Sequence, residues 1–299
     1  MKVLEYMARY GYEQVLLCHD AGVGFTAIIA VHDTTLGPAL GGVRVWDYQS
    51  EDDAILDALR LARAMTFKSA AAGLNLGGGK AVVVGVPRPG QREAVFRSLG
   101  RFIESLGGRY IATEDVGTSL RDMEHISLET SHVSGLPVAM GGSGDPSPVT
   151  AFGLYHAMRA CVEDVSGSPS LKGMRVVVQG VGKVGYNLLP YLVKDGASLA
   201  ISDIREGLAQ QVAAEFNARV VPPDKIYDEE CDIFSPCALG AVLNKRTIPR
   251  LKCRMVCGAA NNQLEELEDG SLLEGRGILY APDFIANAGG VINISVEFT

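Results

Sequence analysis

Three residues in the first half of the chain have side chains suited to acid–base chemistry, and each stands next to an apolar run. Lys68 ends a helical pattern, Lys80 follows three consecutive glycines, and Asp115 follows a short apolar stretch. A lysine among apolar neighbours loses hydration of its charged form, which lowers its pKa and allows it to act as a general base. Considered singly, the three also have ordinary interpretations: Lys80 as a surface lysine beside a loop, Lys68 as a solvated helix end, and Asp115 as a helix N-cap.

The glycines before Lys80 favour the chemical interpretation of that lysine. Glycine lets the backbone pass close to another group, and the run Gly77-Gly78-Gly79 indicates such an approach. We therefore expect Lys80 to lie at the entrance of a buried strand.

Short apolar runs alternate with helical patterns around these residues and supply the elements that position them. Strands separated by helices predict an α/β sheet with parallel pairs. The expected strands of the first half are residues 27–31, 81–86 and 109–112, and its expected helices are residues 52–64, 91–106 and 120–130. The expected strands of the second half are residues 175–179, 198–202, 232–235 and 255–258, and its expected helices are residues 184–194 and 205–216.

A segment rich in Gly, Pro and Ser, residues 135–148, separates the two halves. Such a composition marks a loop, and its glycines are typical of backbone that lies close to a ligand. With 299 residues and 47% hydrophobic content, the chain is long enough to bury two cores. The sequence therefore predicts two α/β domains, residues 1–138 and residues 139–299.

The second half contains the pattern Gly180-x-Gly182-x-x-Gly185 directly after an apolar strand and before a helix. In such a motif the first glycine permits a tight turn, the second lets the backbone approach a pyrophosphate, and the third lets the helix pack closely on the strand. The phosphates lie at the N-terminus of the helix, where free N–H groups favour anions. Residues 139–299 are thus predicted to form a Rossmann-type, doubly wound dinucleotide-binding domain.

An acidic residue stands where such a domain binds the ribose. Asp203 ends the second apolar strand, about 20 residues beyond the loop, and is placed to accept hydrogen bonds from the ribose hydroxyls. A carboxylate there repels a 2′-phosphate, so NAD is favoured over NADP. The nearby Arg205 leaves NADP open.

Charge and cysteine content exclude several classes of function. A net charge of −8 argues against nucleic-acid binding, which needs a basic face. The six cysteines form no Cys-x-x-Cys pair and have no His-rich partner segment, which predicts reduced thiols and no metal site. No apolar run approaches the roughly 18 residues of a membrane span, and the first residues lack the pattern of a signal peptide. We expect a cytoplasmic protein without nucleic-acid or membrane partners.

Several segments together resemble the glutamate/leucine/phenylalanine/valine dehydrogenase superfamily, and its leucine dehydrogenase branch most of all. The resemblance extends essentially from end to end. Its segments are MTFKSAAAG with GLNLGGGKAVVVG around the two lysines, TLGPALGGVR (35–44), EDVGTS (114–119), SPCALGAVLN (235–244), GAANNQL (258–264) and NAGGVIN (287–293).

The resemblance implies a role for each matching position. Lys68 binds the substrate carboxylate, Lys80 is the catalytic base, and Asp115 supports proton transfer to and from the amine and its intermediates. The other expected substrate-binding residues are Leu40, Gly41, Met65, Thr113, Asn262, Val291 and Ile294. The expected cofactor-binding residues are Gly180, Val181, Gly182, Lys183, Val184, Gly185, Asp203, Ile204, Asp145, Pro146, Thr150, Cys237, Ala238, Asn262 and Asn287.

The implied reaction is the reversible, NAD-dependent oxidative deamination of an amino acid to its 2-oxo acid and ammonia. Hydride leaves the substrate Cα for NAD⁺, which gives an imine, and Lys80 activates a water that attacks this imine. The residue types fit, because the charge of Lys68 raises the cost of charging Lys80. The resemblance also implies that residues 1–138 form a mixed α/β substrate and oligomerisation domain, that a cleft separates the domains, and that the protein is a homo-oligomer.

The residues expected around the substrate side chain favour a branched aliphatic amino acid. Leu40 crowds an aromatic ring, Val291 and Ile294 suit a branched chain, and the lack of charge at these positions argues against glutamate. The pair Ala112-Thr113 replaces the Thr-Ala common in leucine dehydrogenases, which leaves the ranking of leucine, isoleucine and valine open. A phenylalanine or tryptophan dehydrogenase and a non-turnover NAD-binding relative remain alternatives. Family members continue with C-terminal helices beyond the point where this sequence ends, Thr299.

Overall fold

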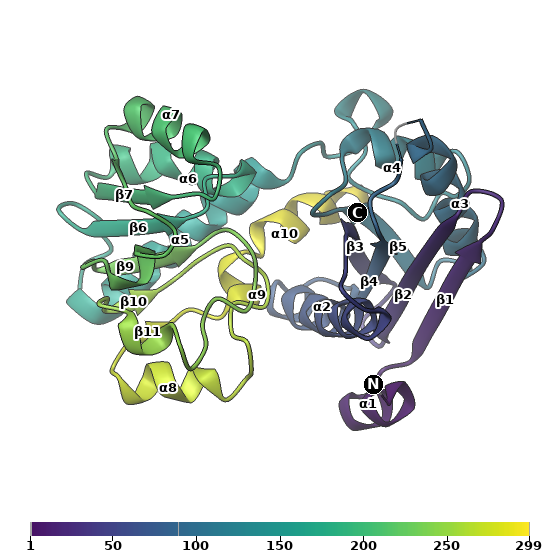
Figure 1. Cartoon of the computed structure of the whole chain (residues 1–299), viewed down its shortest axis with the longest axis horizontal. Coiled ribbons are helices and arrows are strands. Elements are labelled where there is room, and N and C mark those ends of the chain that lie inside the picture. Colours follow the sequence, from purple (N-terminus) through teal and green to yellow (C-terminus); the bar gives the residue numbers. More distant parts are fainter. Residues whose placement is uncertain (1, 89, 299) are drawn as a thin grey trace. The chain divides into compact units, whose positions relative to one another are not determined.

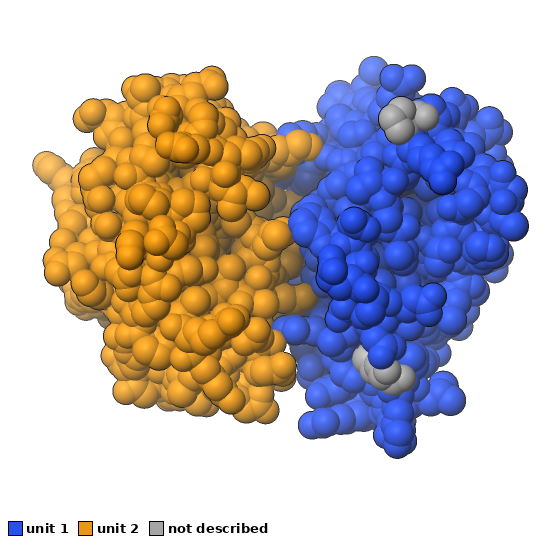
Figure 2. Space-filling view, viewed as in Figure 1, with its two compact units in different colours: residues 1–146, 291–299 blue, residues 147–290 orange. Residues whose placement is uncertain are grey.

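The computed structural model describes residues 2–88 and 90–298, and the chain divides into two compact units (Figures 1 and 2). Unit 1 comprises Met1–Pro146 together with Val291–Thr299, and unit 2 comprises Ser147–Gly290. The boundary expected between residues 138 and 139 lies inside the Gly-rich segment of unit 1. The last residues of the sequence belong to the first unit although they follow the second.

Unit 1 is built on a five-stranded mixed sheet with the strand order β1-β2-β4-β3-β5. The strands β1 and β2 pair antiparallel, as do β2 and β4, whereas β3 pairs parallel with both β4 and β5. The carboxyl ends of β3 and β5 therefore lie at one edge of the sheet. The bounds are β1 Gln14–Asp20, β2 Phe25–Asp33, β3 Ala39–Trp46, β4 Gly77–Val84 and β5 Tyr110–Glu114.

Helices cover both faces of this sheet (Figure 1). Apolar side chains of α3 and α4 pack with one set of strand residues, and those of α2 pack with the alternate set, as the period of two in a strand requires. The helix α2 starts at a Ser50 N-cap, whose hydroxyl accepts the N–H of Asp53 at 3.2 Å. The bounds are α1 Val3–Tyr10, α2 Glu51–Ala71, α3 Arg92–Glu104, α4 Leu120–Ser127, η1 Val138–Met140 and η4 Val296–Phe298. The helix α10, Gly289–Ser295, begins in unit 2 and continues into unit 1.

Unit 2 is built on a six-stranded parallel sheet with the order β11-β10-β9-β6-β7-β8. Numbered from β6, this is the 3-2-1-4-5-6 order of a doubly wound dinucleotide-binding fold, so the predicted Rossmann topology is confirmed. Val176 and Val178 pack in one core cluster and Val177 in another, because successive strand side chains face opposite sides.

The elements of unit 2 alternate along the chain as the sequence predicts. The bounds are α5 Ser147–Ser166, β6 Arg175–Gln179, α6 Lys183–Lys194, β7 Ser198–Ser202, α7 Glu206–Phe216, β8 Arg219–Val220, η2 Ile226–Asp228, β9 Ile233–Pro236, η3 Ile248–Arg250, β10 Met255–Val256, α8 Asp269–Gly275, β11 Leu279–Tyr280 and α9 Asp283–Ala286. The predicted bounds of β6 and β7 are confirmed residue for residue. Among the described residues, no helix has the length and apolarity to cross a membrane.

Two predicted bounds around the lysines are wrong. The helix expected to stop at residue 64 continues to Ala71, so Lys68 lies inside α2. The strand expected to begin at residue 81 begins at Gly77, so the three glycines are part of β4. The sheet also contains β3, which the sequence analysis did not predict although its residues include the ALGGVR run.

The carboxylate of Glu297 binds the Gly-rich segment at two places. The side chain of Glu297 in η4 accepts hydrogen bonds from the backbone N–H of Gly135 at 3.1 Å and of Ser143 at 2.7 Å. The Ser143 hydroxyl donates a further hydrogen bond to it at 2.5 Å. A carboxylate that accepts several such bonds fixes the backbone that supplies them.

Candidate active site

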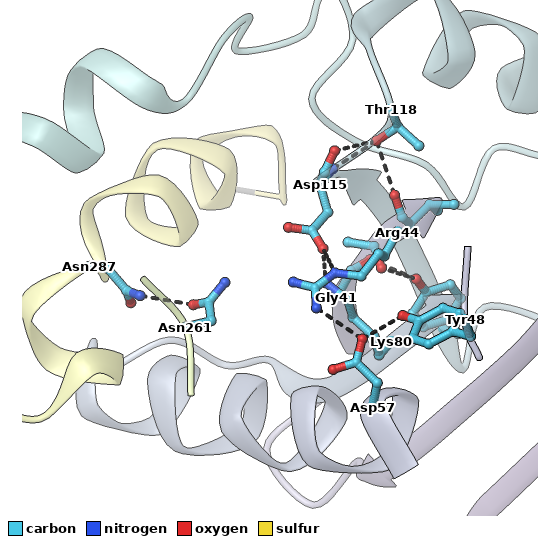
Figure 3. Close-up of polar contacts among 12 residues, drawn as sticks. Gly41, Arg44, Tyr48, Asp57, Lys80, Asp115, Thr118, Asn261 and Asn287 are labelled. Atoms are coloured by element: carbon cyan, nitrogen blue, oxygen red, sulfur yellow. Dashed lines mark hydrogen bonds and ion pairs between the residues drawn. The ribbon is translucent and has the colours of Figure 1, made fainter. Parts of the chain in front are cut away.

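Lys80 and Asp115 form a buried ion pair on the sheet of unit 1 (Figure 3). Lys80 projects from β4 and is 3% exposed, while Asp115 follows the last residue of β5 and is 15% exposed. The Lys80 ammonium donates to the Asp115 carboxylate at 2.5 Å. The prediction of a buried Lys80 is confirmed, and its interpretation as a surface lysine is wrong. Asp115 caps no helix with its side chain, because α4 has Ser119 as its N-cap.

Arg44 joins this pair to a second carboxylate. Its guanidinium, carried by β3, donates to Asp115 at 3.1 Å and to Asp57 of α2 at 2.9 Å. The hydroxyl of Tyr48 donates to Asp57 at 2.5 Å. The sequence analysis assigned no role to these three residues, although Arg44 closes the quoted TLGPALGGVR segment. No local sequence pattern marks these residues, because their contacts join separate elements of the fold.

Burial and neighbouring charges set the protonation of the pair. Burial is the largest influence on Lys80 and lowers its pKa; the Asp115 carboxylate opposes this shift and the Arg44 guanidinium adds to it. Burial disfavours the charged form of Asp115 too, but Lys80 and Arg44 outweigh it and hold the pKa of that carboxyl well below its usual range. Arg44 is therefore the largest cationic influence on Lys80, a role for which the sequence suggested only Lys68.

The glycines around Lys80 are packed against other atoms of the protein, which leave no space for a side chain, and they do not form a flexible loop. A Cβ on Gly42 would lie 2.6 Å from the Cβ of Asp115 and 3.1 Å from the Lys80 ammonium. A Cβ on Gly41 would lie 1.7 Å from the carbonyl oxygen of Gly79. The close approach expected of the triple glycine is confirmed, since a Cβ on Gly78 would also lie 2.1 Å from a backbone nitrogen of α2.

One expected substrate-binding residue, Thr113, lies beside the ion pair in the sheet. Thr113 of β5 is in register with Gly42 of β3, whose added Cβ would approach both members of the pair. The Thr113 side chain is 5% exposed, and among the described residues its hydroxyl oxygen has no hydrogen-bond partner. A buried hydroxyl without a partner is costly, so Thr113 carries an unpaired polar atom inside the sheet.

The remaining expected substrate residues of unit 1 are spread over three elements. Lys68 is buried in α2, and Met65 is half-buried one turn earlier. Leu40 of β3 is fully buried, and Val291 and Ile294 of α10 are each 4% exposed. Their burial agrees with an apolar pocket wall, and their contact with a substrate stays a prediction.

In unit 2 the predicted glycine motif lies at the point where the strand order reverses. The loop after β6 meets the loop after β9, because a Cβ on Gly180 would lie 2.8 Å from the Cβ of Ala238. Gly180 has φ of 96°, a conformation that glycine readily adopts. A Cβ on Gly185 would lie 2.1 Å from the carbonyl oxygen of Gly180 and 3.6 Å from the Cβ of Cys237. Crevices at such switch points bind ligands in doubly wound folds.

Gly182 differs from the other two glycines of the motif. It is the N-cap of α6, and a Cβ there would meet nothing within 4 Å. Its neighbours Val181, Lys183 and Val184 complete the turn into the helix. Nothing in the described chain therefore requires glycine at this position, which leaves the space outside it for a ligand.

The acidic residue after β7 has a fixed environment. Asp203 accepts the backbone N–H of Val181 at 3.1 Å, so it is tied to the glycine loop. It also accepts two hydrogen bonds from the Arg205 guanidinium, at 3.0 and 3.2 Å. Burial alone would raise the pKa of Asp203, but the Arg205 hydrogen bond and the backbone donors lower it. Ile204, between them, is almost fully exposed.

Asparagines gather after β10 and α9 in unit 2. The Asn287 amide donates to the carbonyl of Ala259 at 3.0 Å and to the side-chain oxygen of Asn261 at 2.8 Å (Figure 3). Among the described residues, the buried side-chain oxygen of Asn287 has no partner. Asn262 has φ of 51°, a left-handed conformation that asparagine adopts more readily than most other residues with a side chain. Asn262 and Asn287 were predicted from the sequence to bind ligands, whereas Asn261 was not.

The remaining expected cofactor-binding residues lie just before α5 and in its first turn. Thr150 belongs to the first turn of α5 in unit 2, while Asp145 and Pro146 end the first segment of unit 1. In the described part of the chain, no group of three or more His, Cys, Asp or Glu residues is arranged to hold a metal ion.

Profiles of known families cover nearly all of the sequence. That of the Glu/Leu/Phe/Val dehydrogenase dimerisation domain matches residues 13–132, and that of the Glutamate/Leucine/Phenylalanine/Valine dehydrogenases matches residues 141–212 and 205–299. The chain belongs to this dehydrogenase family. The predicted resemblance is thus confirmed, and with it the assignment of the chain as a member of an oxidoreductase family.

Individual family members resemble the chain to different degrees. The leucine dehydrogenase of Thermoactinomyces intermedius is 57% identical over 99% of this chain and 81% of its own length. The phenylalanine dehydrogenase of the same organism is 46% identical over the same shares of the two chains. The crystal structure of the L-tryptophan dehydrogenase from Nostoc punctiforme is 43% identical, with a TM-score of 0.77 over 98% of this chain and 84% of the other.

Proposed function

We propose that this family member catalyses the reversible, NAD-dependent oxidative deamination of branched-chain L-amino acids. The observation that carries the proposal is the buried Lys80–Asp115 pair, in a chain that is 57% identical to a leucine dehydrogenase. The lower identity to a phenylalanine dehydrogenase, 46%, supports an aliphatic over an aromatic substrate.

The residues of unit 2 fit a dinucleotide. The backbone at Gly182 faces space that a pyrophosphate suits, at the N-terminus of a twelve-residue helix whose N–H groups favour anions. A hydrogen bond from the backbone of Val181 fixes Asp203 near the loop. There its carboxylate is able to accept hydrogen bonds from the ribose hydroxyls. The unpartnered oxygen of Asn287 offers a further acceptor, which suits a carboxamide. When bound, NAD⁺ supplies the acceptor for a hydride from the substrate Cα.

Lys80 is the base in the proposed mechanism. Because burial and Arg44 lower its pKa, a larger fraction of its side chain is neutral near physiological pH than for an exposed lysine. Neutral Lys80 takes a proton from the water that adds to the imine carbon, and its Nζ then carries the positive charge. Asp115, which stays ionised because its pKa is low, stabilises that charge at 2.5 Å. The protonated Lys80 returns a proton when ammonia leaves.

Arg44 is a positioning residue in this scheme. It holds the Asp115 carboxylate at 3.1 Å and is itself held by Asp57. Its charge keeps Asp115 ionised and opposes charging of Lys80, so a single guanidinium acts on both members of the pair. Lys68, buried in α2, is proposed to bind the substrate carboxylate, since a buried cation suits that partner.

An assay with a panel of amino acids tests the proposed function. We expect NADH formation at alkaline pH with L-leucine, L-isoleucine and L-valine, and much less with L-phenylalanine, L-tryptophan or L-glutamate. NAD⁺ is expected to support a higher rate than NADP⁺. Binding of NAD⁺ without any turnover of a branched-chain amino acid would refute the proposal, and a preference for an aromatic substrate would refute its substrate class.

Thr113 offers a finer test of the substrate class. We propose that its side chain shortens the pocket, so Thr113→Ala should raise kcat/KM for leucine relative to valine, by a factor that corresponds to about 1–3 kcal/mol per methylene accommodated. Thr113→Val keeps the shape and removes the hydroxyl, and it serves as the matched control. An unchanged leucine-to-valine ratio in Thr113→Ala would remove Thr113 from the pocket.

We also propose that the protein is a cytoplasmic homo-oligomer. The support is the description of the profile that matches residues 13–132, which names a dimerisation domain, and the six free cysteines, which suit a reducing compartment. Light scattering of the purified chain measures the assembly, and a monomeric mass at micromolar concentration would contradict it.

A further inference from the structure

Two cysteines of unit 2 face each other just before two neighbouring strands, at the end of the sheet opposite the glycine motif. Cys231 and Cys253 lie just before β9 and β10, which pair parallel with Ile233 opposite Met255. The bridge between Glu230 and Lys252 continues the same register, and the N–H of Cys231 donates to the carbonyl of Lys252 at 3.2 Å. The register therefore places Cys231 directly opposite Cys253.

This placement meets the geometric requirement for a disulfide. Neighbouring strands lie about 4.8 Å apart, and disulfides join Cα atoms separated by roughly 4.4–6.8 Å. Both side chains also point to the same face, because Cys231 is part of the core cluster against which Cys253 packs. The backbone need not move far to bring the two sulfur atoms into bonding distance.

The two thiols are unequal in access and charge. Cys253 is partly exposed and Cys231 is 4% exposed. A hydrogen bond from the Cys231 thiol is the largest influence on Cys253 and lowers its pKa. Burial opposes this shift but does not cancel it, and the charge of Arg276 adds to the lowering. The same hydrogen bond and burial raise the pKa of Cys231. Arg276 is held in place by a hydrogen bond to the carbonyl of Leu251 at 2.8 Å.

We propose that Cys253 and Cys231 are the attacking and resolving members of a thiol pair that hydrogen peroxide converts into a reversible disulfide. An accessible thiol with a cation nearby is the kind of cysteine that reacts with peroxide, and a buried partner within reach resolves the product. This assignment does not depend on the proposed dehydrogenase activity.

The reaction balances with peroxide as the only oxidant. The Cys253 thiolate attacks one peroxide oxygen, the O–O bond breaks, and hydroxide leaves and is protonated to water. Cys253 is then a sulfenic acid. The sulfur of Cys231 attacks the sulfur of Cys253, the S–O bond breaks, and a second water leaves as the Cys231 proton is transferred. Two thiols have been oxidised and one peroxide has been reduced to two waters.

Each of the other four cysteines lacks a part of this arrangement: either strand pairing that fixes a partner, or a thiol whose reactive thiolate is favoured. Cys161 of α5 and Cys257 after β10 also interact, but both are buried and they join a helix to the sheet, so no strand pairing fixes their spacing. Burial raises the pKa of Cys18 to about 12 and also raises that of Cys237, and either shift disfavours the reactive thiolate. Cys161 with Cys257 is therefore an internal comparison in the same molecule.

Peptide mapping of the full chain tests the proposal. The folded protein is treated with hydrogen peroxide, free thiols are alkylated after unfolding, and the digest is analysed by mass spectrometry. We expect a peptide that links Cys231 to Cys253, its loss on treatment with dithiothreitol, and alkylated Cys161 and Cys257. Alkylation of both Cys231 and Cys253, or a link between Cys161 and Cys257 in place of theirs, would overturn the assignment.

Three variants separate the roles of the two cysteines. Cys231→Ser should accumulate a sulfenic acid at Cys253 that dimedone traps, whereas Cys253→Ser should leave Cys231 reduced. Cys161→Ser is the matched control and should form the same link as the unmodified chain. Dimedone labelling of Cys231 in Cys253→Ser, at the level of Cys253 in Cys231→Ser, would overturn the order of attack. The map of the unmodified chain decides the pairing even if a variant fails to fold.

Discussion

The two proposed sites of this protein are built in opposite ways. The site of unit 1 consists of charged side chains, Lys80, Asp115, Arg44 and Asp57, linked by hydrogen bonds of 2.5–3.1 Å and largely withdrawn from water. The site of unit 2 consists mainly of backbone, with glycines that allow two loops to meet and a helix N-terminus beside open space. Chemistry that moves protons needs tuned side chains, whereas holding a pyrophosphate needs only N–H groups and room.

This comparison predicts that changes in unit 1 act on turnover and leave cofactor binding unaltered. Lys80→Ala should lower kcat/KM for leucine by roughly 10³-fold, the usual loss when a general base is removed. A fluorescence titration of Lys80→Ala should give the same NAD⁺ affinity as that of the unmodified chain. The exposed Lys245, changed to alanine, is the matched control. Near-normal turnover of Lys80→Ala would end its assignment as the base.

Within unit 2 the comparison separates two glycines of one motif. Gly185→Ala places a Cβ 2.1 Å from a backbone oxygen and should lower the free energy of unfolding by about 1–3 kcal/mol. Gly182→Ala meets nothing within 4 Å, so it should leave unfolding nearly unchanged and weaken NAD⁺ binding. Urea denaturation without cofactor and a titration with NAD⁺ measure the two effects. Equal destabilisation by both substitutions would contradict the distinction.

Asp203 is the charged side chain assigned to the ribose in the proposed dinucleotide site. Asp203→Ala should weaken NAD⁺ binding by about 2 kcal/mol, the value of hydrogen bonds to a charged group, and weaken NADP⁺ binding less. The reason is that Arg205 loses its partner at 3.0 Å and becomes free to meet a 2′-phosphate. Competition titrations with both dinucleotides measure the difference, and an equal loss for both would exclude the ribose assignment.

The smallest expected effect is a shift in the pH profile of kcat/KM. Arg44→Met removes the cation that lowers the pKa of Lys80, so that pKa should rise. Deamination needs neutral Lys80 and increases as pH rises through its pKa, so the rising limb of kcat/KM should move to higher pH. Arg44→Lys keeps the charge and is expected to move it less. A profile that stays in place in Arg44→Met would show that Arg44 does not act on Lys80.

The sequence predicts the fold of unit 2 more closely than that of unit 1. Parallel strands buried on both faces appear as continuous apolar runs, which is why β6 and β7 agree with prediction residue for residue. The mixed sheet of unit 1 hides β3, because its glycines at Gly41 and Gly42 resemble a turn. They are needed instead for close approach to the backbone of Gly79 and to Asp115.

Only part of the proposed site could be predicted from the sequence, and the reason for this is physical. Lys80, Asp115 and the glycine motif have local signals: an apolar surrounding, a strand end or a fixed spacing. Arg44 and Asp57 have none, because they act through contacts between elements far apart in the chain, such as Arg44 of β3 with Asp115 after β5. The sequence analysis likewise assigned to Lys68 the electrostatic effect that falls mainly to Arg44.

The contact of Glu297 with Gly135 and Ser143 has a consequence for synthesis of the protein. Unit 1 consists of two separate stretches of sequence, with the whole of unit 2 between them. On the ribosome the strands of unit 1 emerge first, yet their Gly-rich segment must wait for Glu297 until unit 2 has been translated. Unit 2, residues 147–290, is translated between the two stretches, so the strands of unit 1 are made well before the carboxylate that binds their Gly-rich segment.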